Sequence, residues 1–240
     1  MAEYQQVFKR YEKKYFLTET GYRQMLNLLK NKMQQDSYGL HTICNLYYDT
    51  DRFDIIRASL EKPVYKEKLR LRSYGIPQEQ TRVFVELKKK YDGVVYKRRE
   101  PMPLNEAERF LKKPESFFDQ TQIQKEISWF LRNRDIEAKA FIGYDRTAYF
   151  DQNDPDFRLT FDKNIRWRGE ELDLKKGDWG QRILPEGIYL MELKIHDAIP
   201  LWMCRVLEQC HAEMASFSKY GACYSEHLMS DMRGKGEICA

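Results

Sequence analysis

The chain lacks the features that would mark a membrane protein or a secreted one. No stretch reaches the ~20 apolar residues that a membrane-spanning helix needs. Residues 1–14 carry charges throughout and contain no apolar core of a secretory signal peptide. The sequence therefore predicts a cytoplasmic protein that does not itself enter a membrane, although a membrane protein could be its partner.

Cysteine is scarce and irregularly placed. The 240 residues include five cysteines, an odd number, and no two of them form a C-x-x-C pair. This argues against both a disulfide framework and a zinc site, and it suits a reducing compartment.

Charge of one sign is not in large excess. The 41 lysines and arginines are nearly balanced by 37 aspartates and glutamates, so the formal net charge is only +4. Bulk charge alone does not predict an anionic partner; what matters is whether the cations share one surface. The length allows a sizeable core, and we expect a single domain over residues 1–240.

What the sequence does contain is a series of alternating segments. In residues 66–74, Lys68, Arg70 and Arg72 share one face of a predicted strand, and Leu69 and Leu71 share the other. Two further segments flank an Asp-Gly pair at residues 92–93, which is a strong hairpin signal. The full set of predicted strands covers residues 7–17, 41–48, 66–74, 82–90, 94–100, 141–150, 157–161 and 187–196.

Helical patterns interrupt these strands. Thr18 is a candidate N-cap for a helix over residues 19–33, and further helices are predicted over residues 105–112, 121–134 and 202–215. Helices grouped between runs of antiparallel strands favour the α+β class over a wound parallel sheet.

Cations occupy alternating positions on several predicted strands. For one strand, the ordinary explanation is a solvated outer face with cross-strand ion pairs. Six strands with this pattern, each with apolar residues at the alternate positions, favour a water-filled barrel lumen that binds a polyanion. The charged positions are Lys68, Arg70, Arg72, Glu86, Lys88, Lys90, Lys97, Arg99, Arg146, Arg158, Glu192 and Lys194.

An ordered set of short motifs resembles the catalytic domain of the vacuolar transporter chaperone polyphosphate polymerases, the VTC domain, within the triphosphate tunnel metalloenzymes. The resemblance covers roughly residues 5–225. Each motif is weak alone, but the ordered set is fairly specific. The motifs are Arg10-Tyr-Glu-Lys-Lys14-Tyr, Tyr48-Asp-Thr50, Leu69-Arg-Leu-Arg72, Glu86-Leu-Lys88, Tyr96-Lys-Arg-Arg99, Tyr144-Asp-Arg-Thr147, Arg158-Leu-Thr-Phe-Asp162, Glu192-Leu-Lys194 and Phe217-Ser-Lys-Tyr220.

The resemblance implies an antiparallel eight-stranded β-barrel tunnel with helices packed outside. It implies transfer of the terminal phosphoryl group of ATP to a growing polyphosphate chain, with Mn²⁺ or Mg²⁺ held by Glu192. Catalytic roles would fall to Arg70, Arg72, Lys219 and Glu192. Triphosphate or polyphosphate would contact Lys14, Arg70, Arg72, Lys88, Lys97, Tyr144, Arg146, Arg158, Ser218 and Lys219.

Two positions depart from the family pattern. Tunnel hydrolases open with two carboxylates before the lysine, and here Arg10 replaces the first and leaves only Glu12. Ser216 stands where the polymerases often have a second lysine. The eukaryotic relatives add an N-terminal regulatory domain and membrane spans. This sequence shows neither, so it resembles a stand-alone bacterial version of the family.

Three alternatives remain open from the sequence. A tunnel hydrolase of tripolyphosphate or thiamine triphosphate is disfavoured by Arg10, and a non-catalytic polyphosphate-binding module would not need Glu192. A protein that binds single-stranded nucleic acid would need exposed aromatic side chains, on which nucleobases stack, between its lysines and arginines. Since aromatics such as Tyr47 and Phe84 can equally belong to the core, we expect no nucleic-acid partner.

Overall fold

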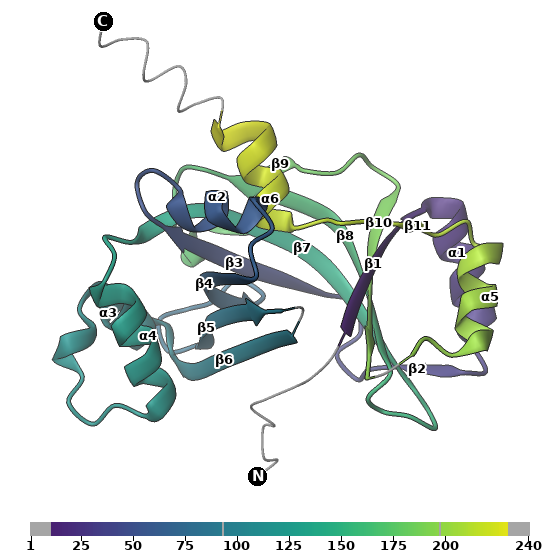
Figure 1. The fold of residues 1–240 in the computed structure, drawn as a ribbon, viewed down its shortest axis with the longest axis horizontal. Coiled ribbons are helices and arrows are strands. Elements are labelled where there is room, and N and C mark those ends of the chain that lie inside the picture. Colours follow the sequence, from purple (N-terminus) through teal and green to yellow (C-terminus); the bar gives the residue numbers. More distant parts are fainter. Residues whose placement is uncertain (1–10, 93, 197, 230–240) are drawn as a thin grey trace, which may run out of the picture.

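The fold is known from a computed structural model that describes residues 11–92, 94–196 and 198–229. Within these residues an eleven-stranded antiparallel sheet is surrounded by helices, which confirms the predicted α+β class (Figure 1). Eight long strands follow one another in the sheet in the order β1-β10-β8-β7-β3-β4-β5-β6. Their bounds are Tyr11–Thr18 (β1), His41–Asp49 (β3), Tyr65–Tyr74 (β4), Arg82–Tyr91 (β5), Val94–Pro103 (β6), Glu137–Asp151 (β7), Arg158–Arg168 (β8) and Ile188–Ile195 (β10).

The predicted closed barrel of eight strands needs correction in two respects. Three short strands join the sheet, namely β2 (Met33–Gln35), β9 (Gln181–Arg182) and β11 (Glu213–Met214). In the described part of the chain, the sheet ends at β6 on one side and at β11 on the other, so hydrogen bonds do not close it. One physical reason is that β11 pairs with Tyr15 and Phe16 and occupies part of the outer edge of β1.

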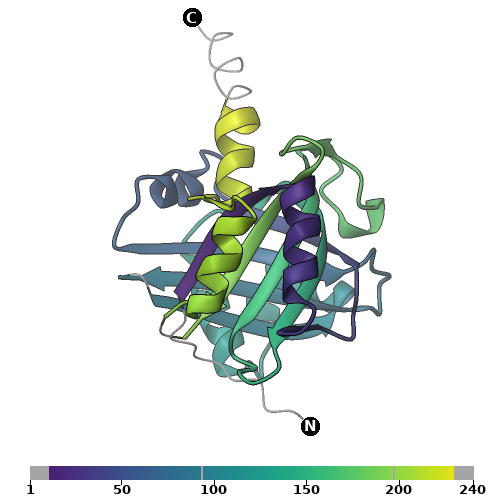
Figure 2. The same ribbon diagram turned by 90° about the vertical axis from the view of Figure 1, so that its right-hand side faces the viewer.

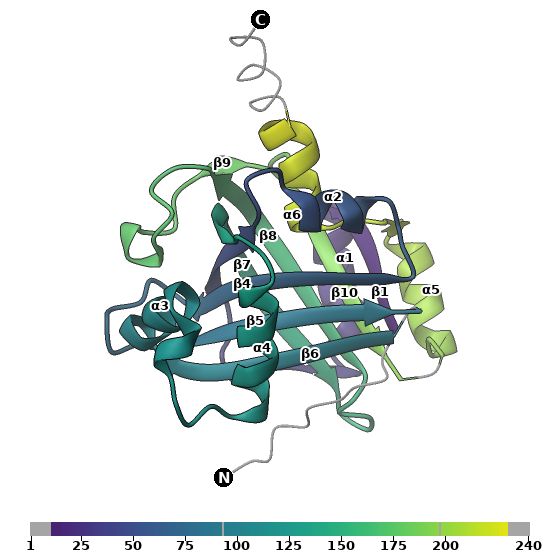
Figure 3. The same cartoon turned by 60° about the vertical axis from the view of Figure 1, so that its left-hand side comes forward.

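Helices cover the outer faces of the sheet in two groups. Helices α1 (Glu19–Leu29) and α5 (Leu201–Gln209) pack outside β1, β10 and β8 (Figure 2), where Leu17, Met25 and Leu193 share one apolar cluster. Helices α3 (Leu104–Lys112) and α4 (Gln122–Arg132) pack outside β4, β5 and β6 (Figure 3), where Leu69 and Phe110 are fully buried. Burial of each such side chain stabilises the fold by about 1.5–3 kcal/mol.

Two short helices lie across one end of the space that the sheet encloses. They are α2 (Asp54–Leu60) and α6 (Lys219–Cys223), and a π-helical turn over Tyr224–Leu228 continues α6 (Figure 3). Two 3-10 turns, Pro114–Ser116 and Leu174–Lys176, complete the described elements. None of the helices in the described residues is long and apolar enough to cross a membrane.

Seven of the eight predicted strands are confirmed to within a few residues where they fall in the described ranges; residues 7–10 and Gly93 lie outside them. The strand predicted over residues 157–161 is confirmed at its start but is too short, because β8 continues to Arg168. Two predicted helices are too long. The helix from Glu19 ends at Leu29 because Met33–Gln35 pairs with β7, and the helix at 202 ends at Gln209 because Glu213–Met214 pairs with β1. Partners distant in sequence decided both ends.

Candidate functional site

The inward faces of the long strands form two facing walls. We call β4, β5 and β6 the Glu86 wall, and β1, β10, β8 and β7 the Glu192 wall; β3 joins them. The alternate, outward positions carry the apolar residues that pack under the helices, so strand periodicity itself turns the cations inward.

The Glu86 wall gathers four cations around one carboxylate. Glu86 is 1% exposed, and its oxygens lie 2.7 Å from Arg70 Nη2, 2.7 Å from Lys97 Nζ and 2.7 Å from Arg99 Nε. Arg72 Nη1 is farther away, at 3.8 Å. The strand register explains the arrangement, since Arg70, Glu86 and Arg99 lie side by side on β4, β5 and β6. Burial alone would raise the pKa of Glu86, but these cations hold it well below its usual range.

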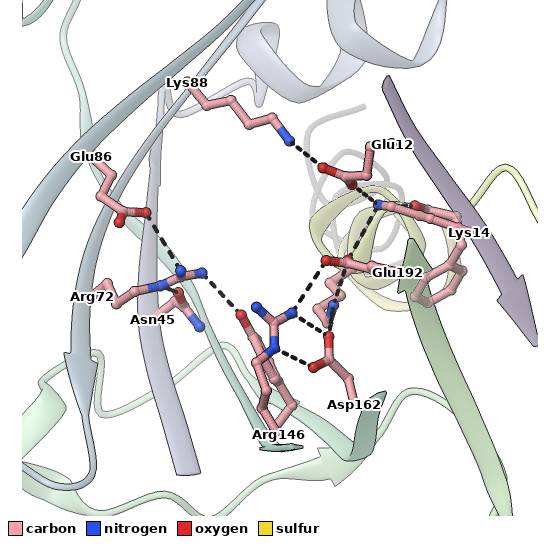
Figure 4. Close-up of polar contacts among 12 residues, drawn as sticks. Glu12, Lys14, Asn45, Arg72, Glu86, Lys88, Arg146, Asp162 and Glu192 are labelled. Atoms are coloured by element: carbon pink, nitrogen blue, oxygen red, sulfur yellow. Dashed lines mark hydrogen bonds and ion pairs between the residues drawn. The ribbon is translucent and has the colours of Figure 1, made fainter. Parts of the chain in front are cut away.

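Arg72 links the two walls. Its Nε donates to Asn45 Oδ1 at 2.9 Å, and its Nη2 donates to the Tyr144 hydroxyl at 2.9 Å (Figure 4). The residue is 5% exposed, and its three guanidinium nitrogens already face Asn45, Tyr144 and Glu86.

The Glu192 wall holds two carboxylates that share their cations. Arg146 forms a fork with Asp162 at 2.5 and 2.7 Å, and its Nη2 also lies 3.2 Å from Glu192. Lys219 Nζ lies 2.5 Å from Asp162 and 3.2 Å from Glu192, and Lys14 Nζ lies 3.6 Å from Glu192. Burial alone would raise the pKa of both carboxyl groups. The neighbouring cations outweigh this effect and keep the pKa of Glu192 and of Asp162 below their usual ranges.

Residues 217–219, which lead into α6, contact both walls. The Phe217 carbonyl accepts from Lys14 Nζ of β1 at 2.8 Å, and Ser218 Oγ lies 2.7 Å from Lys68 Nζ of β4. Ser218 is also the N-cap of α6, because its Oγ accepts the N–H of Gly221 at 3.2 Å. A Cβ at Gly221 would lie 3.1 Å from Leu60 and 3.2 Å from Ser218, so glycine lets α6 pack this closely.

Glu12 connects the walls on the side where no strand pairing closes the sheet. Its carboxylate lies 3.6 Å from Lys88 of β5 and 3.4 Å from Lys14 on its own strand (Figure 4). Burial would raise the pKa of Glu12, but Lys88 and Lys14 outweigh it and lower the pKa to about 2. An ion pair thus spans the opening between β1 and the Glu86 wall.

Solvent reaches part of this interior. The side chain of Lys88 is 38% exposed, that of Lys97 33% and that of Lys14 21%. A ligand can therefore approach these cations without unfolding the protein, whereas Arg72 and Lys219 are buried behind them.

This fold and this basic interior agree with what sequence comparison finds. The profile of the VTC domain matches residues 9–227. The chain belongs to the VTC domain family. A search of curated proteins finds no match.

Solved structures resemble the VTC domain of this chain in fold. A candidate adenylate cyclase from Bacillus halodurans aligns with a TM-score of 0.58 and 13% identity, covering 89% of this chain and 96% of the other. A candidate adenylyl cyclase from Hippeastrum, described as having a dominant triphosphatase activity, aligns with a TM-score of 0.55 and 17% identity, covering 90% and 95%. At these identities the likeness concerns the fold alone.

The structure brings most of the predicted site residues of the VTC domain together. Lys14, Arg70, Arg72, Lys88, Lys97, Tyr144, Arg146, Glu192, Ser218 and Lys219 all take part in the interior contacts described above. Arg158 takes part in none of these contacts: it begins β8 with an exposed side chain and forms no ion pair with another described residue. Arg10 lies outside the described residues.

Several interior residues are not among the predicted site residues. Lys68, Glu86 and Arg99 stand on the predicted charged strand faces without a role in the site. Glu12 and the fully buried Asp162 belong to the motifs, and Asp162 shares the strand face of Arg158 and Thr160. Strand parity could have added these residues, whereas their partners depend on tertiary contacts.

The donor set of the interior suits a hard cation only in part. No group of three or more His, Cys, Asp or Glu side chains in the described residues could hold a metal. Glu12 and Glu192 nevertheless share the inward face of neighbouring strands, and the buried Thr160 Oγ1 beside Glu192 has no hydrogen-bond partner. Mg²⁺ is commonly held by one or two carboxylates plus substrate oxygens, so these residues fit a metal that arrives with a triphosphate.

Proposed function

We propose that this VTC domain is a polyphosphate polymerase that transfers the terminal phosphoryl group of ATP to a growing polyphosphate chain. The observation that carries the proposal is the facing pair of cationic walls, in which inward lysines and arginines outnumber the inward carboxylates. An elongated polyanion that lies between the walls would neutralise this excess through charge-assisted hydrogen bonds.

The interior supplies what phosphoryl transfer requires. Such reactions need alignment and charge stabilisation more than covalent help. Glu86, Asp162 and Glu192 hold the guanidinium and ammonium groups in place before the ligand arrives. Cations that are already oriented need little reorganisation when charge develops on the transferring group.

Each wall has a distinct part in the proposal. Arg70, Lys88 and Lys97 would hold the polyphosphate or triphosphate from one side. From the other side, Lys14, Arg146 and Lys219 would hold the transferring phosphoryl group, with hydroxyl contacts from Tyr144 and Ser218. Arg158 would contact the chain where it reaches the exposed end of β8.

Mn²⁺ or Mg²⁺ would be held by Glu192, with Glu12 as the neighbouring carboxylate and phosphate oxygens completing its coordination. When bound, the metal would neutralise charge on the phosphates. The role of Glu192 in the ligand-free protein is to orient Lys14, Arg146 and Lys219.

A tunnel triphosphatase is the second candidate. The Hippeastrum relative in fold is described as having a dominant triphosphatase activity, and Glu12 provides one carboxylate in the first strand. Arg10 speaks against this candidate, because it replaces the other carboxylate with which the tunnel hydrolases open.

One assay separates the candidates. The protein is incubated with ATP and Mn²⁺, and the products are resolved on a gel that detects long phosphate chains, while free phosphate is measured in parallel. Polymer is expected. Free phosphate without polymer would indicate the triphosphatase. A thermal shift with tripolyphosphate but no turnover would indicate a binding module.

Matched variants assign the activity to the interior. Arg70→Ala removes an inward guanidinium, whereas Arg205→Ala removes an exposed one on α5, outside the sheet. Polymer formation should fall in the first variant and persist in the second. Equal loss in both would contradict the proposed location.

A further inference from the structure

Lys68 and Ser218 form a contact that the proposed function leaves unused. Lys68 lies on β4 two residues before Arg70, and its Nζ is 2.7 Å from Ser218 Oγ. The two residues are 150 positions apart in the sequence, and the start of α6 brings them together. Unlike Arg70 and Lys97, Lys68 forms no ion pair with a carboxylate of the described residues.

The surroundings of Lys68 favour its neutral form. Burial, followed by the charges of Lys88 and Lys14, lowers the pKa of Lys68 to about 7. A neutral amine accepts a proton, and 2.7 Å is a suitable distance for accepting one from a hydroxyl. The same separation serves a charged lysine that donates, so the contact permits proton transfer in either direction.

The surroundings of Ser218 favour a nucleophilic oxygen. The hydroxyl is half-buried, and Gly221 N–H donates to its oxygen at 3.2 Å. Lys14 donates to the carbonyl of the preceding residue, Phe217. Its ammonium group is therefore placed to hold a phosphoryl group near the serine.

We propose that Ser218 is a nucleophile that accepts a phosphoryl group from the bound nucleoside triphosphate, with Lys68 as its general base. The bond that forms joins Ser218 Oγ to the γ-phosphorus. The bond that breaks joins this phosphorus to the β,γ-bridging oxygen, and the nucleoside diphosphate leaves with the electron pair. The serine proton moves to Lys68 Nζ. The product is phosphoserine, and nothing is oxidised or reduced.

This proposal rests on the proposed function, because the interior must bind a nucleoside triphosphate. The competing explanation is purely structural: Lys68 donates to the N-cap and fixes the start of α6. The two explanations differ in whether Ser218 gains phosphate.

Mass spectrometry tests the proposal directly. The protein is incubated with ATP and Mn²⁺, quenched in acid and digested with trypsin. Cleavage after Arg205 and Lys219 places Ser216 and Ser218 in one peptide, residues 206–219, and fragmentation separates the two sites. Acid removes phosphate from lysine and histidine but not from serine. We expect HPO₃ increments on Ser218 and none on the exposed Ser216.

Variants separate a base from a structural contact. Lys68→Arg keeps the positive charge and the donor, but arginine does not lose its proton in proteins. We expect this variant to retain tripolyphosphate binding in a thermal-shift assay and to lose at least nine-tenths of the phosphoserine. Ser218→Ala should show no phosphate in the peptide. Lys125→Met, which removes an exposed cation on α4 outside the sheet, should keep the modification.

The outcomes are distinguishable from those of the polymerase assay. Polymer without phosphoserine at any time point would overturn the inference and leave the proposed function standing. Phosphoserine without polymer would support the inference and overturn the polymerase. A Lys68→Arg protein that is phosphorylated at the parent rate would remove Lys68 as the base. Absence of both phosphoserine and nucleotide turnover would overturn both proposals.

Discussion

The two walls use different numbers of carboxylates for similar numbers of cations. On the Glu86 wall, one carboxylate that is 1% exposed serves Arg70, Arg72, Lys97 and Arg99. On the Glu192 wall, Asp162 and Glu192 both bind Arg146 and Lys219. The first arrangement has no second carboxylate, whereas in the second Asp162 would keep Arg146 and Lys219 in place if Glu192 bound the proposed metal. The contrast favours a structural role for Glu86 and agrees with the role proposed for Glu192.

The largest effect should follow loss of the single carboxylate. In Glu86→Gln, four inward cations lose their counter-ion, and breaking a buried pair by removing one partner typically costs about 3–5 kcal/mol. The free energy of unfolding, measured by denaturant titration, should fall by this amount. Tripolyphosphate should stabilise the variant more than the parent because it can replace the lost charge.

The control for this prediction is Glu126→Gln on α4, outside the sheet. Glu126 pairs with Arg98 at 3.0 Å and Lys89 at 3.6 Å, and solvent screens the pairs, so the loss should stay within about 1 kcal/mol. Equal losses in the two variants would contradict a special role for Glu86 in the fold.

The next effect concerns turnover. In Glu192→Gln, Asp162 still binds Arg146 and Lys219, so stability and tripolyphosphate affinity should change little. Synthesis from ATP should fall by about a hundredfold or more, since metal stabilisation of the transferring phosphoryl group contributes several kcal/mol at about 1.4 kcal/mol per tenfold. A variant that polymerises at the parent rate would remove Glu192 from the mechanism.

A smaller effect should distinguish a paired cation from an exposed one. Arg70→Ala should weaken tripolyphosphate binding and turnover together by about tenfold, or ~1.4 kcal/mol. Arg158→Ala, at the exposed end of β8, should change affinity less and leave the unfolding midpoint unaltered. Isothermal titration at two salt concentrations measures both, and the salt dependence should be weaker in each variant because one charge contact is lost.

The smallest effect is a pH dependence on the Glu86 wall. Burial and the facing charges of Lys88, Lys14, Lys66 and Arg70 lower the pKa of Lys68 to about 7. A bound polyanion raises this pKa, so binding takes up a proton when the pH lies above about 7, and Lys68 acts as a base only in complexes in which it has lost that proton. Affinity should therefore fall a few-fold as pH rises from about 7 towards the ordinary lysine pKa of ~10.4.

Calorimetry in buffers of different ionisation enthalpy measures that proton uptake. Lys68→Arg is the control, because arginine stays protonated throughout, and it also accounts for titration of the ligand itself. Equal uptake by the parent and by Lys68→Arg would place the titration elsewhere.

The strands could be predicted because each carries its own alternation. Lys68, Arg70 and Arg72 face inward for the same reason that Leu69 and Leu71 face outward: successive side chains on a strand point to opposite sides. The short helix α6 was not predicted, since its five residues are too few to show a periodic pattern. The ends of α1 and α5 were set by the pairing of β2 and β11 with distant strands, which local patterns do not contain.

The class of fold, the family and the positive charge of the interior follow from the sequence, because they depend on local periodicity and on ordered motifs. The tertiary structure is needed to see which cations share a carboxylate and where the sheet remains open. It also placed Ser218 against Lys68, 150 residues away in the chain. Such contacts depend on strand order, register and the packing of α6 across one end of the sheet. These follow from the free energy of the whole fold and not from any one segment.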